Sequence, residues 1–219
     1  MKKNVLIVVT SAEKINEEKA TGLWLSEFAE PYIEFSKQGF NITVASPLGG
    51  KTPIDNNSLS GDVPQEILDT QQYLENTTKL DEIQSTDYDA ILLPGGHGTM
   101  FDLPNNEKLQ SLLREFYEAG KIVSAVCHGP AGLVNTKLSN GKYLVEGKRI
   151  TSFTDSEEKA AGLDSFMPFL LESKLRHAGS IFVAKPDWSD HIEIDGNLIT
   201  GQNPQSTLSV AKEIIAKLK

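Results

Sequence analysis

Short, uninterrupted apolar runs recur along this chain of 219 residues, and segments with helical patterning separate them. The clearest runs are residues 5–9, 90–93 and 122–126. Apolar runs of this length without alternation are typical of strands buried on both faces. Strands that alternate with helices favour a mostly parallel sheet covered by helices on both sides. The sequence therefore predicts an α/β fold.

The rest of the chain fits the same alternation. Helices are expected over residues 22–37, from Asn105 or Asn106 to Gly120, over 166–176, and from Asn203-Pro204 onward; further strands are expected over 40–45, 149–153 and 181–184, with a hairpin at 191–200. Residues 47–84 are polar and contain many Gly and Pro residues, which predicts an irregular insertion with one short helix near 75–82. No repeat or low-complexity linker divides the chain, so one domain over 1–219 is expected.

Composition narrows the classes of partner and compartment. The formal net charge is −9, which disfavours a nucleic-acid backbone as a ligand. No window reaches the roughly 18 apolar residues of a membrane span, and the run 5–9 is too short for a signal peptide. A single cysteine permits no internal disulfide and is consistent with a reducing compartment. We therefore expect a cytoplasmic protein that binds neither nucleic acid nor membrane.

That cysteine, Cys127, follows the apolar run 122–126 and precedes His128-Gly129-Pro130. Pro130 suits the first turn of a helix, where its missing N–H is not required. A cysteine at such a strand-to-helix corner would occupy a nucleophile elbow, with the first N–H groups of the helix facing the sulfur. Those donors and the positive helix end predict a lowered thiol pKa and an exposed thiolate. The alternative is a buried structural thiol, since free cysteine is among the most buried residue types.

Four pieces of the sequence together resemble the ThiJ/PfpI superfamily, which has the class I glutamine amidotransferase-like fold. They are the strand before Cys127, the elbow Cys127-His128-Gly129-Pro130, the turn Pro94-Gly95-Gly96-His97-Gly98 and the segment Phe153-Thr154-Asp155-Ser156-Glu157-Glu158. The resemblance covers nearly the whole chain and points to the branch of glutathione-independent glyoxalases (glyoxalase III) and heat-shock chaperones. It implies a flavodoxin-like α/β sandwich with a nucleophile elbow, and a homodimer.

The resemblance also implies a triad of Cys127, His128 and an acid from the downstream segment. The matching acid is Glu158, with Asp155 and Glu157 as alternatives. An acid beside the imidazole would hold its tautomer and orientation. Taken by themselves, the two glutamates would be an acidic pair at a helix N-terminus, where they complement the helix dipole.

A glutamate beside the cysteine is a further implication, and Glu27 matches that position. A carboxyl buried there would have a raised pKa and could both donate and accept protons. Its spacing with Glu30 and Glu34 also fits a solvated helix face.

The glycine pair Gly95-Gly96 follows a predicted strand. Such a pair often forms only a turn, but glycine also lets the backbone approach a ligand closely. The resemblance implies an oxyanion hole formed by the N–H groups of Gly96 and His128. Gly95 and His97 are expected to line the substrate pocket.

The resemblance implies a cofactor-free glyoxalase of the D-lactate dehydratase type, which converts methylglyoxal and related small dicarbonyls to 2-hydroxy acids. The alternatives are a holding chaperone for stress-unfolded proteins, and a protein deglycase or weak aminopeptidase that uses the same Cys-His-Glu site on glycated proteins or peptides. The chain has no zinc-ligand spacing, phosphate-binding loop or dinucleotide fingerprint, so neither a metal nor a cofactor is expected.

Overall fold

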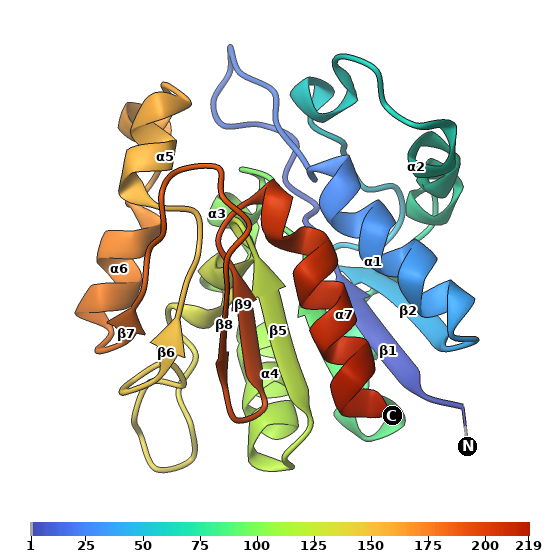
Figure 1. The fold of residues 1–219 in the computed structure, drawn as a ribbon, viewed down its shortest axis with the longest axis vertical. Coiled ribbons are helices and arrows are strands. Elements are labelled where there is room, and N and C mark those ends of the chain that lie inside the picture. The colour runs from blue at the N-terminus through green and yellow to red at the C-terminus, as the bar shows by residue number, and fades with distance from the viewer. Residues whose placement is uncertain (1) are drawn as a thin grey trace.

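The computed structural model describes residues 2–219 and has a seven-stranded sheet of order β3-β2-β1-β4-β5-β9-β8 at its centre (Figure 1). The strands are β1 Asn4–Val8, β2 Asn41–Ser46, β3 Thr78–Lys79, β4 Ala90–Leu93, β5 Ile122–Val126, β8 Ile192–Asp195 and β9 Leu198–Gly201. All neighbouring pairs are parallel except the β8–β9 hairpin. Two short strands, β6 Arg149–Ile150 and β7 Ile181–Phe182, form a separate parallel pair. The predicted α/β fold with a mostly parallel sheet is confirmed.

Helices cover both faces of the sheet. They are α1 Leu25–Lys37, α2 Gln65–Asp69, α3 Thr99–Asp102, α4 Glu107–Glu118, α5 Asp155–Ala160, α6 Leu171–His177 and α7 Thr207–Leu218. In Figure 1, α1 and α7 lie side by side on the near face and α4 lies behind β5.

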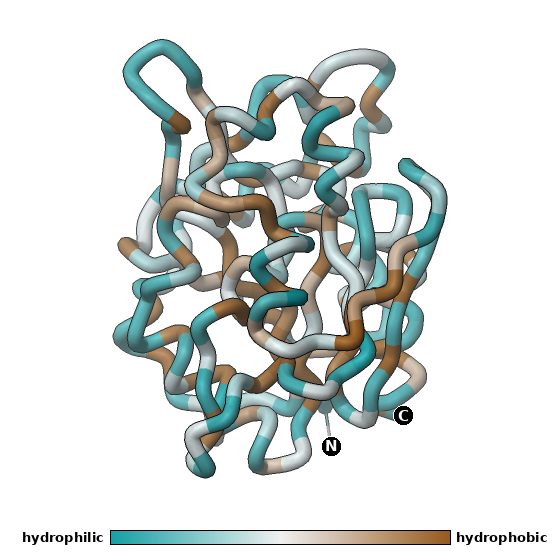
Figure 2. Tube along the Cα trace, turned by 90° about the vertical axis from the view of Figure 1, so that its left-hand side faces the viewer, coloured by the Kyte–Doolittle hydropathy of each residue, from teal (hydrophilic) through white to brown (hydrophobic). Residues whose placement is uncertain are grey.

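Alternation along the strands divides the core in two. On β1, Leu6 and Val8 pack with the buried face of α4, whereas Val5 and Ile7 pack with α1 and α7. Burial of both faces explains why these strands are apolar without alternation. In Figure 2, hydrophobic stretches lie inside the molecule and hydrophilic stretches lie along the outer loops.

The predicted helix near 75–82 is wrong. Only a three-residue 3₁₀ helix, Leu80–Glu82, lies in the predicted range. The longer helical segments lie earlier, in α2 and the 3₁₀ helix Thr70–Leu74, after Pro64 at the N-cap of α2. Residues 78–79 instead form β3, which pairs with β2 at the sheet edge. The β-branched pair Thr77-Thr78 favours this extended conformation. The interpretation of the chain as a single domain stays a prediction.

Other predicted boundaries also differ from those in the structure. The helix expected from residue 166 begins at Leu171, because Pro168 holds the preceding Met167 extended at ψ 145°. The strand expected over 149–153 ends at Ile150. The helix expected from residue 22 begins at Leu25, and the N–H of Leu23 donates instead to a carbonyl of the insertion, Pro53 O, at 2.8 Å.

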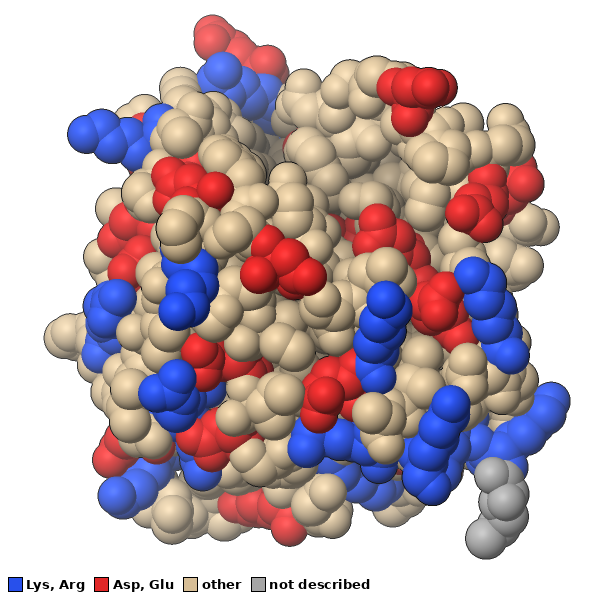
Figure 3. All heavy atoms as spheres, in the orientation of Figure 1, with Lys and Arg blue, Asp and Glu red and all other residues tan. Residues whose placement is uncertain are grey.

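Within residues 2–219, no helix has the length and apolar composition needed to cross a membrane. Basic and acidic side chains are interspersed over the face seen in Figure 3.

The strands β1, β4, β5 and β9 run parallel, so their carboxyl ends meet at one edge of the sheet. Ligand sites of open α/β sheets lie at this edge. Residues that directly follow β4 and β5 lie in the candidate site.

Candidate active site

The cysteine at the end of β5 has the backbone conformation of a nucleophile elbow. Cys127 has φ 59°, and within residues 2–219 only one other residue besides glycine, Trp188, has a positive φ. Its N–H donates to Gly201 O at 3.0 Å and its carbonyl accepts from Phe153 N at 2.9 Å, which fixes the strained residue from both sides. A Cβ on Gly129 would lie 2.0 Å from Leu93 O, so the turn after the cysteine requires glycine.

The sulfur is not an exposed thiolate, and that prediction is wrong. Cys127 is only 4% exposed, and burial raises the pKa of its thiol well above the ordinary value, with the neighbouring Glu27 carboxylate as the next cause. The helix after the elbow is a single 3₁₀ segment, Gly129–Leu133, so it contributes little macrodipole. The resting side chain is therefore a thiol, and a base must remove its proton.

His128 lies beside the thiol and is held by a carboxylate. The Cys127 Sγ to His128 Nδ1 distance is 3.4 Å, and His128 Nε2 lies 2.6 Å from Glu158 Oε2. The other oxygen of Glu158 lies 2.6 Å from His97 Nε2. One buried carboxylate thus bridges two imidazoles, whose ring centroids are 4.1 Å apart.

The ionisation of these groups determines the histidine tautomer. Burial by itself would raise the pKa of Glu158, but the hydrogen bonds from His128 and His97 outweigh it and lower the pKa to about 2. Burial, followed by the charge of His97, lowers the pKa of His128 to about 4. Near neutral pH the Glu158 carboxylate can only accept, so the neutral His128 carries its proton on Nε2. The lone pair of Nδ1 then faces the thiol of Cys127.

Local helix chemistry explains why Glu158 and not its neighbours meets His128. Thr154 caps α5 and forms a capping box with Glu157, whose carboxylate accepts from Thr154 N at 2.9 Å. This turns Glu157 away from the imidazoles. Asp155 accepts from the backbone N–H of Ser173 on α6 at 3.3 Å. Of the three candidate acids, the structure places Glu158 beside His128.

Glu27 lies in the first turn of α1 and is fully buried, rather than on a solvated helix face. Its Oε2 accepts from Gly95 N at 2.6 Å, whereas its Oε1 has no partner within residues 2–219. Burial raises the pKa of Glu27 to about 8; the hydrogen bond from Gly95 and the interaction with Cys127 oppose this rise. A carboxyl in this state exchanges a proton near neutral pH, and it lies next to the sulfur.

The glycine pair after β4 packs directly against the elbow. A Cβ on Gly95 would lie 2.6 Å from His128 N, and a Cβ on Gly96, where φ is 95°, would lie 2.2 Å from Gly22 O. Within residues 2–219, the N–H groups of Gly96 and His128 donate to no protein acceptor. Free backbone donors beside a nucleophile are the arrangement of an oxyanion hole.

A residue that was not predicted from the sequence joins these two loops. The Thr99 hydroxyl lies 2.9 Å from Gly96 O and 3.0 Å from His128 O, so one side chain fixes both backbones. Its place after the glycine-rich turn was visible, but nothing in the sequence shows which carbonyls it reaches. His97 contacts Glu158 through its Nε2 and is 7% exposed. That it lines the substrate pocket stays a prediction.

His97, His128 and Glu158 are also the residues best arranged to hold a metal, since their ligand atoms lie within 4.8 Å of one another. Both nitrogen–oxygen contacts are 2.6 Å, however, which is hydrogen-bond distance. A metal ion would have to replace both hydrogen bonds. We assign the cluster to proton transfer.

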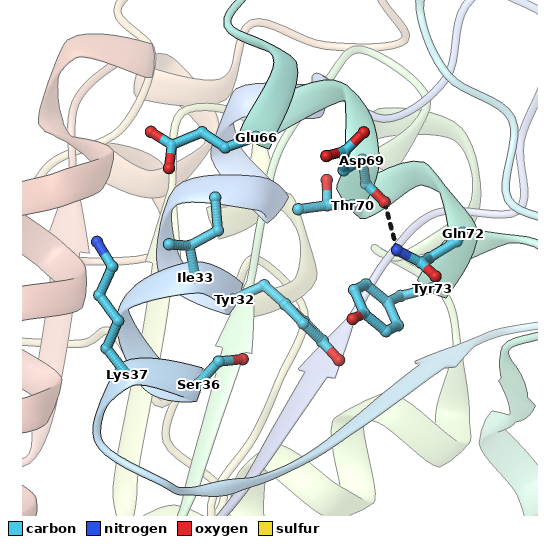
Figure 4. A pocket seen from close by; sticks show the side chains of 9 residues that line it. All are labelled: Tyr32, Ile33, Ser36, Lys37, Glu66, Asp69, Thr70, Gln72 and Tyr73. Atoms are coloured by element: carbon cyan, nitrogen blue, oxygen red, sulfur yellow. Dashed lines mark hydrogen bonds between the residues drawn. The ribbon is translucent and has the colours of Figure 1, made fainter.

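A hollow elsewhere on the surface is not part of this site. It lies between α1 and the helical turns of the insertion, and includes Tyr32 and Tyr73, which stack at 4.2 Å (Figure 4). None of its lining residues belongs to the Cys127 cluster.

The sequence and the fold both have known counterparts. The family model described as DJ-1/PfpI family matches residues 19–217. The Saccharomyces cerevisiae protein named glutathione-independent glyoxalase HSP31 is 34% identical over 236 residues, covering 99% of this chain and 98% of that protein.

Two crystal structures are similar over nearly the whole chain. That of glyoxalase III from Candida albicans has a TM-score of 0.90 and 32% identity, covering 98% of this chain and 96% of the other. That of Rapid Encystment Protein 24 kDa from Francisella tularensis has a TM-score of 0.93 and 37% identity, covering 99% of each chain. The resemblance predicted from the elbow and the glycine turn is confirmed: this chain belongs to the DJ-1/PfpI family.

Proposed function

We propose that this protein is a cofactor-free, glutathione-independent glyoxalase that converts methylglyoxal and related small dicarbonyls to 2-hydroxy acids. Relatives about a third identical over the full chain carry that activity in their names. The observation that carries the proposal is that Cys127 has two proton-transfer partners. His128 faces the sulfur from the loop after β5, and the protonatable Glu27, in the first turn of α1, helps to raise the pKa of the Cys127 thiol. Hydrolysis needs only the first partner, whereas an internal redox isomerisation also needs the second.

In the first step, the sulfur adds to the aldehyde carbon of methylglyoxal. His128 Nδ1 accepts the thiol proton as the S–C bond forms, which removes the need for a preformed thiolate. The N–H groups of Gly96 and His128 hold the developing oxyanion, an interaction worth about 3–4 kcal/mol per donor in other enzymes. Return of the proton to that oxygen gives a hemithioacetal.

In the second step, Glu27 moves a proton between the two carbons. Its carboxylate removes the proton from the former aldehyde carbon to give an enediolate, and the same carboxyl returns that proton to the adjacent carbon. The hydroxyl proton of the former aldehyde carbon passes to the oxygen of the former ketone. The product is a thioester of a 2-hydroxy acid, with one carbon oxidised and the other reduced. A pKa of about 8 suits this role, because both protonation states are accessible near neutral pH.

In the last step, water cleaves the thioester. His128 accepts a proton from the water, and the same amides hold the second oxyanion. The carboxylic acid leaves, and the proton returns to the sulfur of Cys127. For methylglyoxal the product is lactate.

The direct experiment is lactate formation from methylglyoxal without glutathione. Cys127→Ser should abolish it, because a serine hydroxyl is a far weaker nucleophile in the same geometry. Near wild-type turnover in the variant would refute the proposal. Unfolding curves of both proteins show whether the variant is folded.

We also propose that the protein is a cytoplasmic homodimer. Its ligand is the small dicarbonyl substrate, and it binds neither nucleic acid nor membrane. The chaperone and the deglycase or aminopeptidase activities stay predictions. Nothing favours the chaperone, since the large exposed apolar side chains, such as Leu48, Phe166 and Ile181, are scattered among different elements.

A further inference from the structure

The second strained residue of the chain lies next to the site. Trp188 has φ 64°, a conformation that is an outlier for a bulky side chain. Such strain costs about 1–3 kcal/mol and persists only where surrounding contacts impose it. In Figure 1 the segment between β7 and β8 rises beside α5 and turns over the upper ends of β8 and β9.

Glu157 imposes it. This fully buried carboxylate accepts five hydrogen bonds: Oε2 accepts from Thr154 N and Oγ1, at 2.9 and 3.1 Å. Its Oε1 accepts from Trp188 N at 2.8 Å, and from the side-chain amides of Gln202 at 3.2 Å and Asn203 at 2.9 Å. The carboxylate therefore joins three segments: the start of α5, the Trp188 loop and the turn after β9.

The Trp188 ring is the outer end of a row of aromatic rings that starts at His128, the residue next to the nucleophile. His128 packs on Phe153 with centroids 4.4 Å apart, and Phe153 packs on Trp188 at 5.6 Å. His128 and Phe153 are 1% and 4% exposed, whereas Trp188 is 43% exposed. The indole thus separates the buried rings beside Cys127 from solvent.

We propose that Trp188 is the outer wall of the entrance to Cys127 and a specificity-determining residue, which admits short dicarbonyls and disfavours those with an aromatic substituent. Glu157 is its positioning residue. The choice of dicarbonyls as substrates rests on the proposed function, but the wall itself does not.

Thiol labelling tests the wall without any turnover. Cys127 is the only cysteine, so the rates of labelling by N-methylmaleimide and N-phenylmaleimide report on its access alone. Trp188→Gly removes the ring and suits the positive φ, so the variant should fold. We expect the phenyl-to-methyl rate ratio to rise about tenfold, equivalent to ~1.4 kcal/mol of barrier. Tyr73→Ala is the matched control, since Tyr73 is also 43% exposed and lines the separate hollow of Figure 4; its ratio should not change.

Turnover gives the second measurement. The kcat/KM ratio of phenylglyoxal to methylglyoxal should rise in Trp188→Gly by a similar factor. If Trp188→Gly turns over methylglyoxal but changes neither the labelling-rate ratio nor the kcat/KM ratio, Trp188 does not restrict access to Cys127. That result would leave the glyoxalase proposal unaffected. A raised labelling ratio in a protein that turns over neither dicarbonyl would support the wall and refute the proposed function.

Glu157→Gln tests the positioning residue. All its partners donate, so the new amide N–H₂ must face at least one donor, and the hold on Trp188 weakens. The labelling ratio should rise as in Trp188→Gly. In the Trp188→Gly background, the same substitution should leave the ratio unchanged. An unchanged ratio in the single variant, or a further rise in the double variant, would show that Glu157 does not act through the indole.

Discussion

The Cys127 Sγ atom lies 3.4 Å from Nδ1 of His128, its neighbour in the sequence. Successive side chains of a strand point to opposite faces, so this contact exists only because Cys127 leaves the extended conformation at φ 59°. The backbone strain at the elbow is thus what brings the base to the nucleophile.

Glu158→Gln should abolish most activity although the side chain keeps its shape. A glutamine amide can donate to His128 Nε2, which would move the ring proton to Nδ1 and remove the base from Cys127. We expect kcat to fall by about 10⁴, the loss seen when the orienting acid of another triad is replaced by its amide. Steady-state lactate formation measures it. Asp155→Asn is the control and should stay near wild type, because Asp155 meets α6 rather than His128.

Substitution of the two histidines that contact Glu158 should lower kcat to different extents. His128 faces the sulfur, whereas His97 only donates to the carboxylate. His97→Gln retains a donor and should keep kcat within about tenfold of wild type, while His128→Gln removes a general base worth about 10²–10⁴. Equal losses in the two variants would contradict the assignment of the base to His128.

The pH dependence of turnover should follow the ionisation of Glu27. Its carboxylate is the proposed base for the carbon-bound proton, and its pKa is about 8. Below that pH the ionised fraction falls tenfold per unit, so log kcat/KM should rise with a slope near one up to about pH 8. Glu27→Gln should remove both the activity and this dependence. A flat profile between pH 6 and 8 would count against the role of Glu27.

The same carboxyl should make the folded state less stable as the pH rises. The pKa of Glu27 is raised from 4.5 to about 8 on folding, so between these values the folded state binds more protons than the unfolded state. The free energy of unfolding must therefore fall with rising pH in this window, by roughly 3–5 kcal/mol from this group. In denaturant unfolding, the free energy of unfolding of Glu27→Gln relative to that of wild type should increase from pH 5 to pH 8. A constant difference between the two proteins would contradict the burial of an ionisable Glu27.

Gly95→Ala should impair catalysis more than stability. The new methyl group would meet His128 N at 2.6 Å and Glu27 Oε2 at 2.7 Å, so it would displace both a proposed oxyanion donor and a proposed base. Loss of one oxyanion donor costs about 10²–10³ in kcat in other enzymes. Gly39→Asn is the control, because no atom of residues 2–219 outside the adjacent residues lies within 4 Å of a Cβ at Gly39, and asparagine tolerates its φ of 72°.

Much of this protein can be read from local patterns. The apolar runs 90–93 and 122–126 predict doubly buried strands, because burial of both faces leaves no place for polar residues. The elbow and the glycine turn were predicted from adjacent residues, Cys127-His128-Gly129-Pro130 and Pro94-Gly95-Gly96. These features depend on neighbours in sequence or on the period of the element that carries them.

The environment of each group could not be read in this way. The sequence predicted a low thiol pKa from an adjacent helix end, but burial and Glu27, a hundred residues earlier, raise it. Glu157 and Glu158 are indistinguishable neighbours until the capping box turns one toward Trp188 and the other toward His128. Desolvation and hydrogen bonding depend on what surrounds a group in space, and here the surroundings come from segments far apart in the chain.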